Sequence, residues 1–446
     1  FRLFISNNIS TTKYYIKEAK PLYERQLIFN NIDLFASNSK TKFYEKIFDV
    51  IDLSKFPKYH TSKFGPTGYS LHALFRSFIV MKTEKLAKIT ELLSFLDTNP
   101  YIAYLCGFEP FKPLPSYSVF QRFIKNLDNE LLKEVMESQV LRLNELEFID
   151  NSFVSCDGTP VFANTKQNNA KSFASNKFSK DNPPKSDPDC KLGVHTASNS
   201  HNEKKYEFYW GYQNIVLTDA ISGLPIAEKT TTANVSESSI VIDFLKETNK
   251  WFSLKETYFI GDKAYDTKEI YNYIRYDLKG HAFIPINPRN TKKKKMLNDT
   301  NIICEAGLAM HKDGKQYFDS YIKQKFCCPF RTKKDDSLCP CKHPKYFNGK
   351  KNRGCTRYIS IGTDYRASIN RESIFFKKIY ALRTESERYN SRWKNLNLEK
   401  PTVRNINSIT NLNTLGHITL LSLALAAIAD NQKDKIRSLS KFKRAS

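Results

Sequence analysis

The stretch YALRTESERYNSRWK, residues 380–394, places a tyrosine, an arginine, a glutamate and a lysine at i, i+3, i+7 and i+14. On an α-helix, with about 100° per residue, Tyr380, Arg383, Glu387 and Lys394 fall within roughly 60° of one another. A stripe facing a core would be apolar at this spacing, and ordinary surface charges would be scattered. The stripe suggests a phosphate-handling surface around a metal-ligating glutamate, although Glu, Lys and Arg are also common on helix surfaces.

Two aspartates upstream stand in apolar, strand-like stretches. Asp157 interrupts FVSCDGTPVF, and Asp262 follows the apolar run of TYFIGDKAYD. Acidic residues are unfavourable in strands, so a turn, a cap or a metal usually holds them there. Asp266 starts the capping-box pattern DTKE ahead of a helical run, and we predict that it caps that helix. Asp157 and Asp262 have no such local role.

Two strand-borne aspartates and one helix-borne glutamate can converge to hold two divalent ions. Ions about 3.5–4 Å apart can clamp the attacking and leaving oxygens of an in-line phosphoryl displacement. Magnesium prefers oxygen ligands of this kind. The pattern therefore predicts phosphoryl-transfer chemistry at Asp157, Asp262 and Glu387.

The chain resembles the bacterial insertion-sequence transposases, which carry a DDE catalytic triad on a ribonuclease-H-like fold. The signature Y-x2-R-x3-E-x6-K of that family is matched at all four positions of the stripe, and its two aspartate blocks are similar to SCDGTPVF and FIGDKAYD. Further similarity covers YWGY at residues 209–212 and the run from Val216 to Val235, and the resemblance spans roughly residues 60–430.

The resemblance implies a DNA transposase that hydrolyses a phosphodiester at each transposon end and then joins the freed 3′-hydroxyl to target DNA. Asp157, Asp262 and Glu387 would ligate Mg²⁺ or Mn²⁺. Arg383 and Lys394 would hold phosphates, and the Tyr380 hydroxyl would position one. The implied partners are double-stranded DNA, as transposon ends and target, and a second copy of the chain when assembled on DNA. A nuclease on the same fold and an inactive DNA-binding descendant remain as alternatives.

Composition agrees with a polyanionic partner. The formal charge is +24 and the pI is near 9.4, with the basic residues spread along the chain. Neutralising phosphates releases counterions and gives affinity for nucleic acid of any sequence, so other nucleic-acid binders would share this feature. Lys far outnumbers Arg, and Phe, Tyr, Ile and Asn are abundant, so part of the charge can reflect an AT-rich coding sequence.

The cellular location of the protein can also be predicted from its sequence. No secretory-type segment opens it, and nine cysteines without secretory context indicate reduced thiols, so we expect a cytoplasmic, nucleoid-associated protein. The apolar run from Leu415 to Ala429 is shorter than the roughly 20 residues that span a membrane. We therefore expect a buried C-terminal helix that packs on a sheet, and no membrane partner.

The expected architecture is α/β: a ribonuclease-H-like catalytic core, a mixed sheet flanked by helices, with an N-terminal all-helical domain and an inserted Cys-rich subdomain. In the core we expect strands at 206–218 and 225–232, and a polar surface loop at 165–205. The expected parts are a helical DNA-binding domain (1–150), the core (151–290 and 372–430), the basic Cys-rich insertion (291–371) and a basic tail (431–446).

A break at Pro110–Pro115 separates two helical segments in the N-terminal domain. The pattern SVFQ at residues 118–121 predicts a capping box that opens a helix running to about Glu145. A helix, a turn and a capped helix can bind DNA, with Gln121, Arg122 and Lys125 as the contacts. The same pattern is also typical of a plain pair of antiparallel helices.

The expected insertion is rich in cysteine and begins with a basic run. Cys328, Cys339, Cys341 and Cys355 supply enough soft ligands for a tetrahedral zinc site, but their spacing departs from a regular C-x2-C pair. Reduced structural cysteines are the other interpretation. Relatives with this layout place an insertion between the second aspartate and the glutamate, and Lys292, Lys293, Lys294 and Lys295 would suit a DNA backbone.

Overall fold

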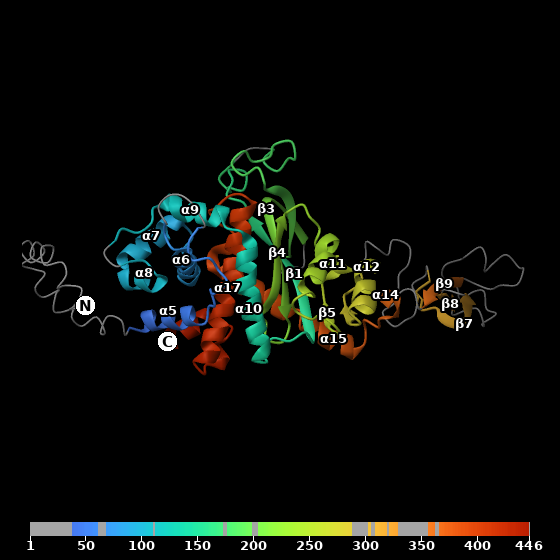
Figure 1. Cartoon of the computed structure of the whole chain (residues 1–446). Coiled ribbons are helices and arrows are strands. Elements are labelled where there is room, and N and C mark those ends of the chain that lie inside the picture. The colour runs from blue at the N-terminus through green and yellow to red at the C-terminus, as the bar shows by residue number, and fades with distance from the viewer. Residues whose placement is uncertain are drawn as a thin grey trace, which may run out of the picture. The chain divides into compact units, whose positions relative to one another are not determined.

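A computed structural model of the chain describes residues 38–60, 68–109, 112–172, 176–198, 204–287, 302–304, 308–318, 321–328, 356–361 and 365–445 (Figure 1). The chain forms two compact units. The first combines residues 1–124 with 418–446, and the second runs from 125 to 417.

The first unit is helical in its described part. It contains α5 (Ser39–Asp49), α6 (Leu71–Thr83), α7 (Ile89–Thr98), α8 (Pro100–Cys106), most of α9 (Tyr117–Asn126), η6 (Lys433–Lys435) and α18 (Leu439–Ala445). The apolar side chains of α6 from Leu71 to Ile79 are buried, and Phe78 packs against the rings of Phe120 and Phe123. The core of this unit therefore combines aliphatic side chains with a cluster of aromatic rings.

The prediction of one capped helix from Ser118 to Glu145 is wrong in detail. Helix α9 begins at Tyr117, one residue before the expected cap, and ends at Asn126. A second helix, α10 (Asn129–Glu145), starts after Asp128, whose side chain accepts a hydrogen bond from the Glu130 N–H at 3.1 Å. Asp128 therefore caps a new helix where the sequence pattern suggested continuation.

The second unit is built around a six-stranded sheet. Its strands are β1 (Phe153–Phe162), β2 (Lys191–Ser198), β3 (Lys204–Asp219), β4 (Pro225–Thr232), β5 (Tyr258–Ile260) and β6 (His281–Phe283). The order is β2-β3-β1-β5-β6, with β4 also paired to β3. Strand β1 is antiparallel to β3 and parallel to β5. This mixed sheet flanked by helices is consistent with the ribonuclease-H-like core that the resemblance implies.

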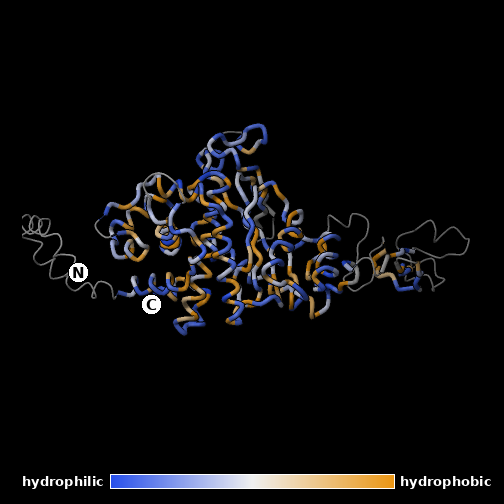
Figure 2. Tube along the Cα trace, in the orientation of Figure 1, coloured by the Kyte–Doolittle hydropathy of each residue, from blue (hydrophilic) through white to orange (hydrophobic). Residues whose placement is uncertain are grey.

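Strands β3 and β4 lie where the sequence predicts them, but the polar segment 165–205 is not wholly a loop. Its residues 191–198 form β2, which pairs with β3. Here β2 extends the sheet by backbone hydrogen bonds, which apolar periodicity does not report. In Figure 2 the apolar stretches, in orange, follow the central strands and the long C-terminal helix.

Helices flank this sheet. They are α10, α11 (Glu237–Thr248), η1 (Lys263–Tyr265), α12 (Lys268–Asn272), η2 (Tyr273–Asp277), α14 (Tyr365–Ser368), α15 (Ile374–Ala381), α16 (Thr384–Trp393), η5 (Lys394–Leu398) and α17 (Ile406–Ala429). Figure 1 shows α10 and α17 on one side of the sheet and α11 and α12 on the other. A separate sheet of β7 (His311–Phe318), β8 (Tyr321–Cys327) and β9 (Thr356–Ile361) has order β7-β8-β9.

Helix α17 begins before the predicted apolar run, at Ile406. It is long and apolar enough to cross a membrane by length and composition, but 89% of its most apolar window is buried inside the protein, as a core helix would be. Its residues up to 417 belong to the second unit, where His417 Nε2 lies 3.0 Å from Asn214 Oδ1 of β3. The helix is therefore buried as expected, and it packs on the sheet through its residues up to His417, while the predicted run from Ile418 onward belongs to the first unit.

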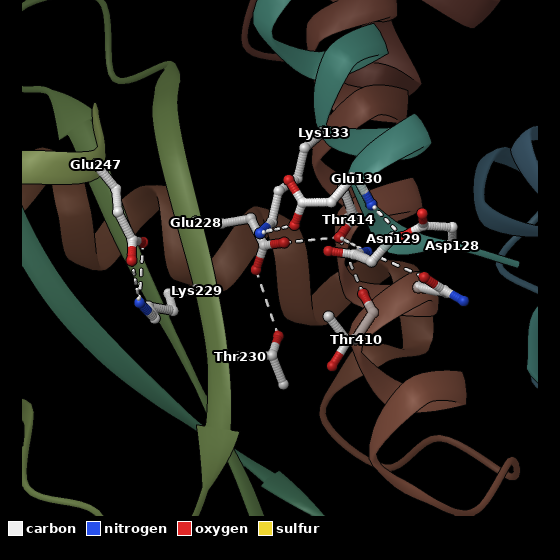
Figure 3. Close-up of polar contacts among 11 residues, drawn as sticks. Asp128, Asn129, Glu130, Lys133, Glu228, Lys229, Thr230, Glu247, Thr410 and Thr414 are labelled. Carbon is white, nitrogen blue, oxygen red and sulfur yellow. Dashed lines mark hydrogen bonds and ion pairs between the residues drawn. The ribbon is translucent and has the colours of Figure 1, made fainter. Parts of the chain in front are cut away.

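A fully hydrogen-bonded carboxylate joins β4 to α17 in the sheet interior (Figure 3). Glu228 accepts hydrogen bonds from Thr414 Oγ1 at 2.6 Å, Asn214 Nδ2 at 2.7 Å and Thr230 Oγ1 at 3.3 Å. Asn129 of α10 donates in turn to Thr414 Oγ1 at 2.9 Å. Burial raises the pKa of Glu228, while these hydrogen bonds work in the opposite direction. The carboxylate is thus part of the packing between sheet and helices.

Candidate active site

The sheet register brings the two predicted aspartates together. In the parallel pair of β1 and β5, Ser155 lies opposite Ile260. Asp157 is two residues beyond Ser155, in the middle of β1, and Asp262 is two residues beyond Ile260, just past the end of β5. The parallel register therefore places the two acids at the same level of neighbouring strands. Asp262 stands just past the last paired residue, where its Oδ1 accepts a hydrogen bond from the Ala264 N–H at 2.6 Å and caps η1. The aspartate is held by this turn.

Helix α16 carries Glu387 toward the same place. Asn390, three residues further along this helix, donates from Nδ2 to Asp157 Oδ2 at 2.9 Å. Residues three apart share a helix face, so Glu387 faces β1 as well. Arg383 lies between the two acids, with Nη1 2.5 Å from Glu387 Oε1 and Nη2 4.0 Å from Asp157 Oδ1. An arginine therefore supplies the counter-charge for these carboxylates.

The electrostatics of Asp157 show that the three acids interact. Burial raises the pKa of Asp157, Arg383 lowers it, and the carboxylates of Asp262 and Glu387 raise it again, which leaves the pKa at about 6. Among the residues that the structure describes, no three His, Cys, Asp or Glu side chains are arranged so that they could hold a metal ion as they stand. Asp157 and Glu387 lie on either side of Arg383, and a cation between them would have to compete with its guanidinium.

The stretch 380–394 does not form one continuous α-helix. Tyr380 lies near the end of α15, which stops at Ala381, and α16 starts at Thr384. Between them the Arg383 N–H donates to the Tyr380 carbonyl at 3.1 Å, a tighter turn than an α-helix makes. Tyr380 still lies within electrostatic range of Arg383 and the three acids, and burial raises its pKa.

Lys394 directly follows α16 with α-helical backbone angles and begins η5. Its Nζ forms an ion pair of 2.8 Å with Glu399 Oε1. The tightened turn before Thr384 changes the angle between successive residues, so the helical wheel is interrupted between Tyr380 and the rest of the stripe.

The prediction that Asp266 caps the next helix is also wrong. The cap of α12 is Thr267, whose Oγ1 accepts from the Ile270 N–H. The Asp266 carboxylate instead accepts two hydrogen bonds of 2.6 Å from Arg366, a residue 100 positions away, and one of 2.7 Å from the Asn287 N–H. These donors outweigh the effect of burial and lower the pKa of Asp266.

A fourth acid, missed from the sequence, lies close to the site. Glu237 begins α11, and its carboxylate accepts hydrogen bonds from Tyr265 OH at 2.6 Å and from Gln213 Nε2. Burial raises the pKa of Glu237 to about 7, the bond from Tyr265 lowers it, and Asp157 and Asp262 raise it. In the sequence an acid after Ser236 looks like an ordinary first-turn residue of a helix, so nothing local distinguishes it.

The other predicted binding residues are placed as follows. Gln121, Arg122 and Lys125 lie on the exposed side of α9, whose buried side carries Phe120 and Phe123. Cys328 is buried after β8. Lys292, Lys293, Lys294, Lys295, Cys339, Cys341 and Cys355 lie outside the described residues.

Comparison with known proteins decides the family. The family model for the transposase DDE domain matches residues 148–421, and that for a transposase domain (DUF772) matches residues 32–126. The chain belongs to the DDE transposase family. It is an insertion-sequence DNA transposase, and the nuclease and inactive alternatives are not favoured. The matched DDE region contains Asp157, Asp262 and Glu387.

Two further comparisons add little. No curated protein matches the chain. A solved piggyBac transposase synaptic complex with hairpin DNA is similar at 10% identity, over 92% of this chain and 80% of that chain, with a TM-score of 0.35. That score is too low for the likeness to bear on this transposase. As a DDE transposase the protein acts on DNA, and enzymes of this family generally use divalent metal ions.

Proposed function

We propose that Asp157, Asp262 and Glu387 are the catalytic carboxylates of this transposase. The observation that carries the proposal is the parallel register of β1 and β5, which sets Asp157 of β1 level with Asp262 just past the end of β5, with α16 delivering the glutamate beside them. The mutual effect of the three carboxylates on the pKa of Asp157 supports this assignment. Acids that crowd each other in this way are costly for folding and typical of functional sites.

The donor set fits Mg²⁺, or Mn²⁺ in its place. The three carboxylates offer hard oxygen ligands, and two of them, Asp157 and Glu387, already flank the positive charge of Arg383. Asp157, Asp262 and Glu387 would hold the ions. When bound, such ions supply Lewis-acid activation of the attacking oxygen and charge stabilisation of the leaving oxygen.

The neighbouring side chains prepare the site for a phosphate. Arg383 Nε is buried and has no hydrogen-bond partner within the described part of the chain. A phosphodiester oxygen would satisfy this donor and draw the guanidinium away from Glu387. Asn390 fixes the orientation of the Asp157 carboxylate through its 2.9 Å hydrogen bond. Tyr380 would position the same phosphate by its hydroxyl, and Lys394 would contribute once DNA displaces Glu399.

The remaining roles follow the domain plan expected from the sequence. The core of residues 151–290 and 372–430 would carry out cleavage and strand transfer, on a ribonuclease-H-like fold. The helical domain 1–150 would bind DNA through the exposed face of α9, and Lys292 to Lys295 would contact the backbone. The Cys-rich insertion would hold a structural zinc ion. A homodimer would assemble on paired transposon ends, in the nucleoid.

The test is strand nicking in Mg²⁺ with the variants Asp157→Asn, Asp262→Asn and Glu387→Gln, each measured beside gel-shift affinity. Each substitution removes a ligand charge and keeps the shape, so we expect nicking to fall by on the order of 10³-fold or more while DNA affinity is nearly unchanged. Glu269→Gln, on the exposed surface of α12, is the matched control. Wild-type nicking rates from any of the three variants would refute the assignment.

A further inference from the structure

Glu237 links strand β3 to the turn that carries Asp262. One of its carboxylate oxygens accepts from Gln213, which lies on β3 opposite Pro160 of β1. The other accepts at 2.6 Å from the hydroxyl of Tyr265, the last residue of the η1 turn that Asp262 caps. Glu237 therefore holds the sheet on one side and the Asp262 turn on the other.

The carboxylate lies directly against β1, at the residue after Asp157. A Cβ atom on Gly158 would come 2.2 Å from Glu237 Oε1, so only glycine leaves room for the carboxylate. Successive side chains of a strand point to opposite faces, so Asp157 and the Gly158 position face opposite sides of β1. Tyr265 OH lies 3.4 Å from Cys156 Sγ on the same face as Gly158. Glu237 thus approaches the site from behind Asp157.

We propose that Glu237 is a fourth carboxylate of the active site, acting as a positioning residue. It fixes the Asp262 turn against β1, and its negative charge behind Asp157 strengthens the attraction of the site for divalent cations. This inference rests on the proposed role of Asp157, Asp262 and Glu387. Glu237 ligates no ion itself, because its oxygens already accept hydrogen bonds from Gln213 and Tyr265 on the far face of the strand.

The two parts of this role respond differently to substitution. Glu237→Gln keeps the shape and an acceptor oxygen but removes the charge. Gly158→Ala keeps every charge but pushes the carboxylate out of its place against β1. Tyr265→Phe keeps the charge and the sheet contact but cuts the link to the Asp262 turn. A residue that served packing alone would be sensitive to the last two substitutions and tolerant of the first.

The experiment is run at about pH 8, above the pKa of about 7 of Glu237, so that its carboxylate is charged. It measures Mn²⁺ binding to the full chain without DNA by electron paramagnetic resonance, and the Mg²⁺ concentration that half-saturates nicking. For Glu237→Gln we expect both midpoints to rise roughly three- to tenfold, as expected for losing one charge a few ångströms from a divalent ion. The thermal unfolding temperature without metal should not fall. Glu247→Gln is the matched control, because Glu247 lies on the same helix and pairs with Lys229 on the surface.

For Tyr265→Phe and Gly158→Ala we expect a loss of maximal nicking rate larger than the change in either metal midpoint. Unchanged metal midpoints in Glu237→Gln, while Asp157→Asn is inactive, would overturn the role of Glu237 and leave the proposed site intact. Wild-type nicking by Asp157→Asn would instead refute the site itself. Unchanged metal midpoints and an unchanged unfolding temperature in Glu237→Gln, beside lowered unfolding temperatures in Gly158→Ala and Tyr265→Phe, would mark Glu237 as a packing residue.

Discussion

Glu228 and Asp157 are both acids in strands of the same sheet, and their surroundings differ in kind. Burial raises the pKa of both. Glu228 accepts hydrogen bonds from the neutral donors Thr414, Asn214 and Thr230, and the positive charge of Lys133 also acts on it favourably. Asp157 receives one hydrogen bond from a neutral side chain, that of Asn390, and otherwise faces two carboxylates and an arginine.

The contrast separates a carboxylate that stabilises the fold from one that is available for chemistry. A buried acid with satisfied oxygens contributes to packing, and removing it leaves its donors unpaired. An acid held next to other acids destabilises the folded protein until a cation arrives. The expected consequences of mutation are therefore opposite at the two positions.

The largest expected effect is this reversal between activity and stability. Asp157→Asn should reduce nicking by on the order of 10³-fold or more and leave the free energy of unfolding unchanged or higher, because a repelled charge is gone. Glu228→Ala should lower the free energy of unfolding by about 3 kcal/mol, because three buried donors lose their acceptor. Urea unfolding measures the free energy of unfolding, and the nicking rate per folded molecule measures the activity.

A Glu228→Ala protein with normal stability would remove the basis of the comparison, since the hydrogen-bonded carboxylate would then not stabilise the fold. An Asp157→Asn protein that unfolds far more easily than the wild type would contradict the comparison at Asp157, because Asp157 would then be a packing residue.

The second, smaller effect is a dependence of stability on pH. The pKa of Asp157 in the folded protein is about 6, above its ordinary value near 4, so the folded state binds more protons between these values. Without metal the free energy of unfolding should therefore fall as pH rises from about 4 to 6. We expect the wild type to lose on the order of 2 kcal/mol more than Asp157→Asn over this window.

Thermal or urea unfolding in chelator, at several pH values, gives this difference curve. Comparing the two proteins cancels the titration of the other carboxylates. Added Mg²⁺ should abolish the difference between the two curves, since bound ions keep the Asp157 carboxylate of the wild type charged. Parallel curves for the two proteins would mean that Asp157 ionises as an ordinary surface acid does.

The sequence was enough to select the proposed catalytic acids only with help from the family resemblance. An acid within an apolar strand is the signal that pointed to Asp157, but Glu228 sits in the strand PIAEKTTT and carries the same signal. What separates them is the identity of their neighbours, and those neighbours come from α16 and α17, far along the chain. Local pattern cannot report such contacts.

The errors made from the sequence have the same origin. Asp266 matches a capping box, yet Arg366 reaches it from 100 residues away and leaves the cap to Thr267. Tyr380 fits an ideal helical stripe with Arg383 and Glu387, yet the chain tightens before Thr384 and ends one helix at Ala381. Strands β3 and β4 and the C-terminal helix were predictable because their sequence patterns are local. The pairing of β2, the role of Glu237 and these partners depend on tertiary contacts.

The central claim is that Asp157, Asp262 and Glu387 hold the divalent ions. Iron-directed cleavage of the protein tests it without relying on activity: Fe²⁺ replaces Mg²⁺, and ascorbate with peroxide generates hydroxyl radicals that cut the backbone beside the bound ion. The account predicts new fragment ends near residues 157, 262 and 387, suppressed by excess Mg²⁺ and lost in Asp157→Asn. Cuts that Mg²⁺ suppresses at other positions, with none near these three residues, would contradict it.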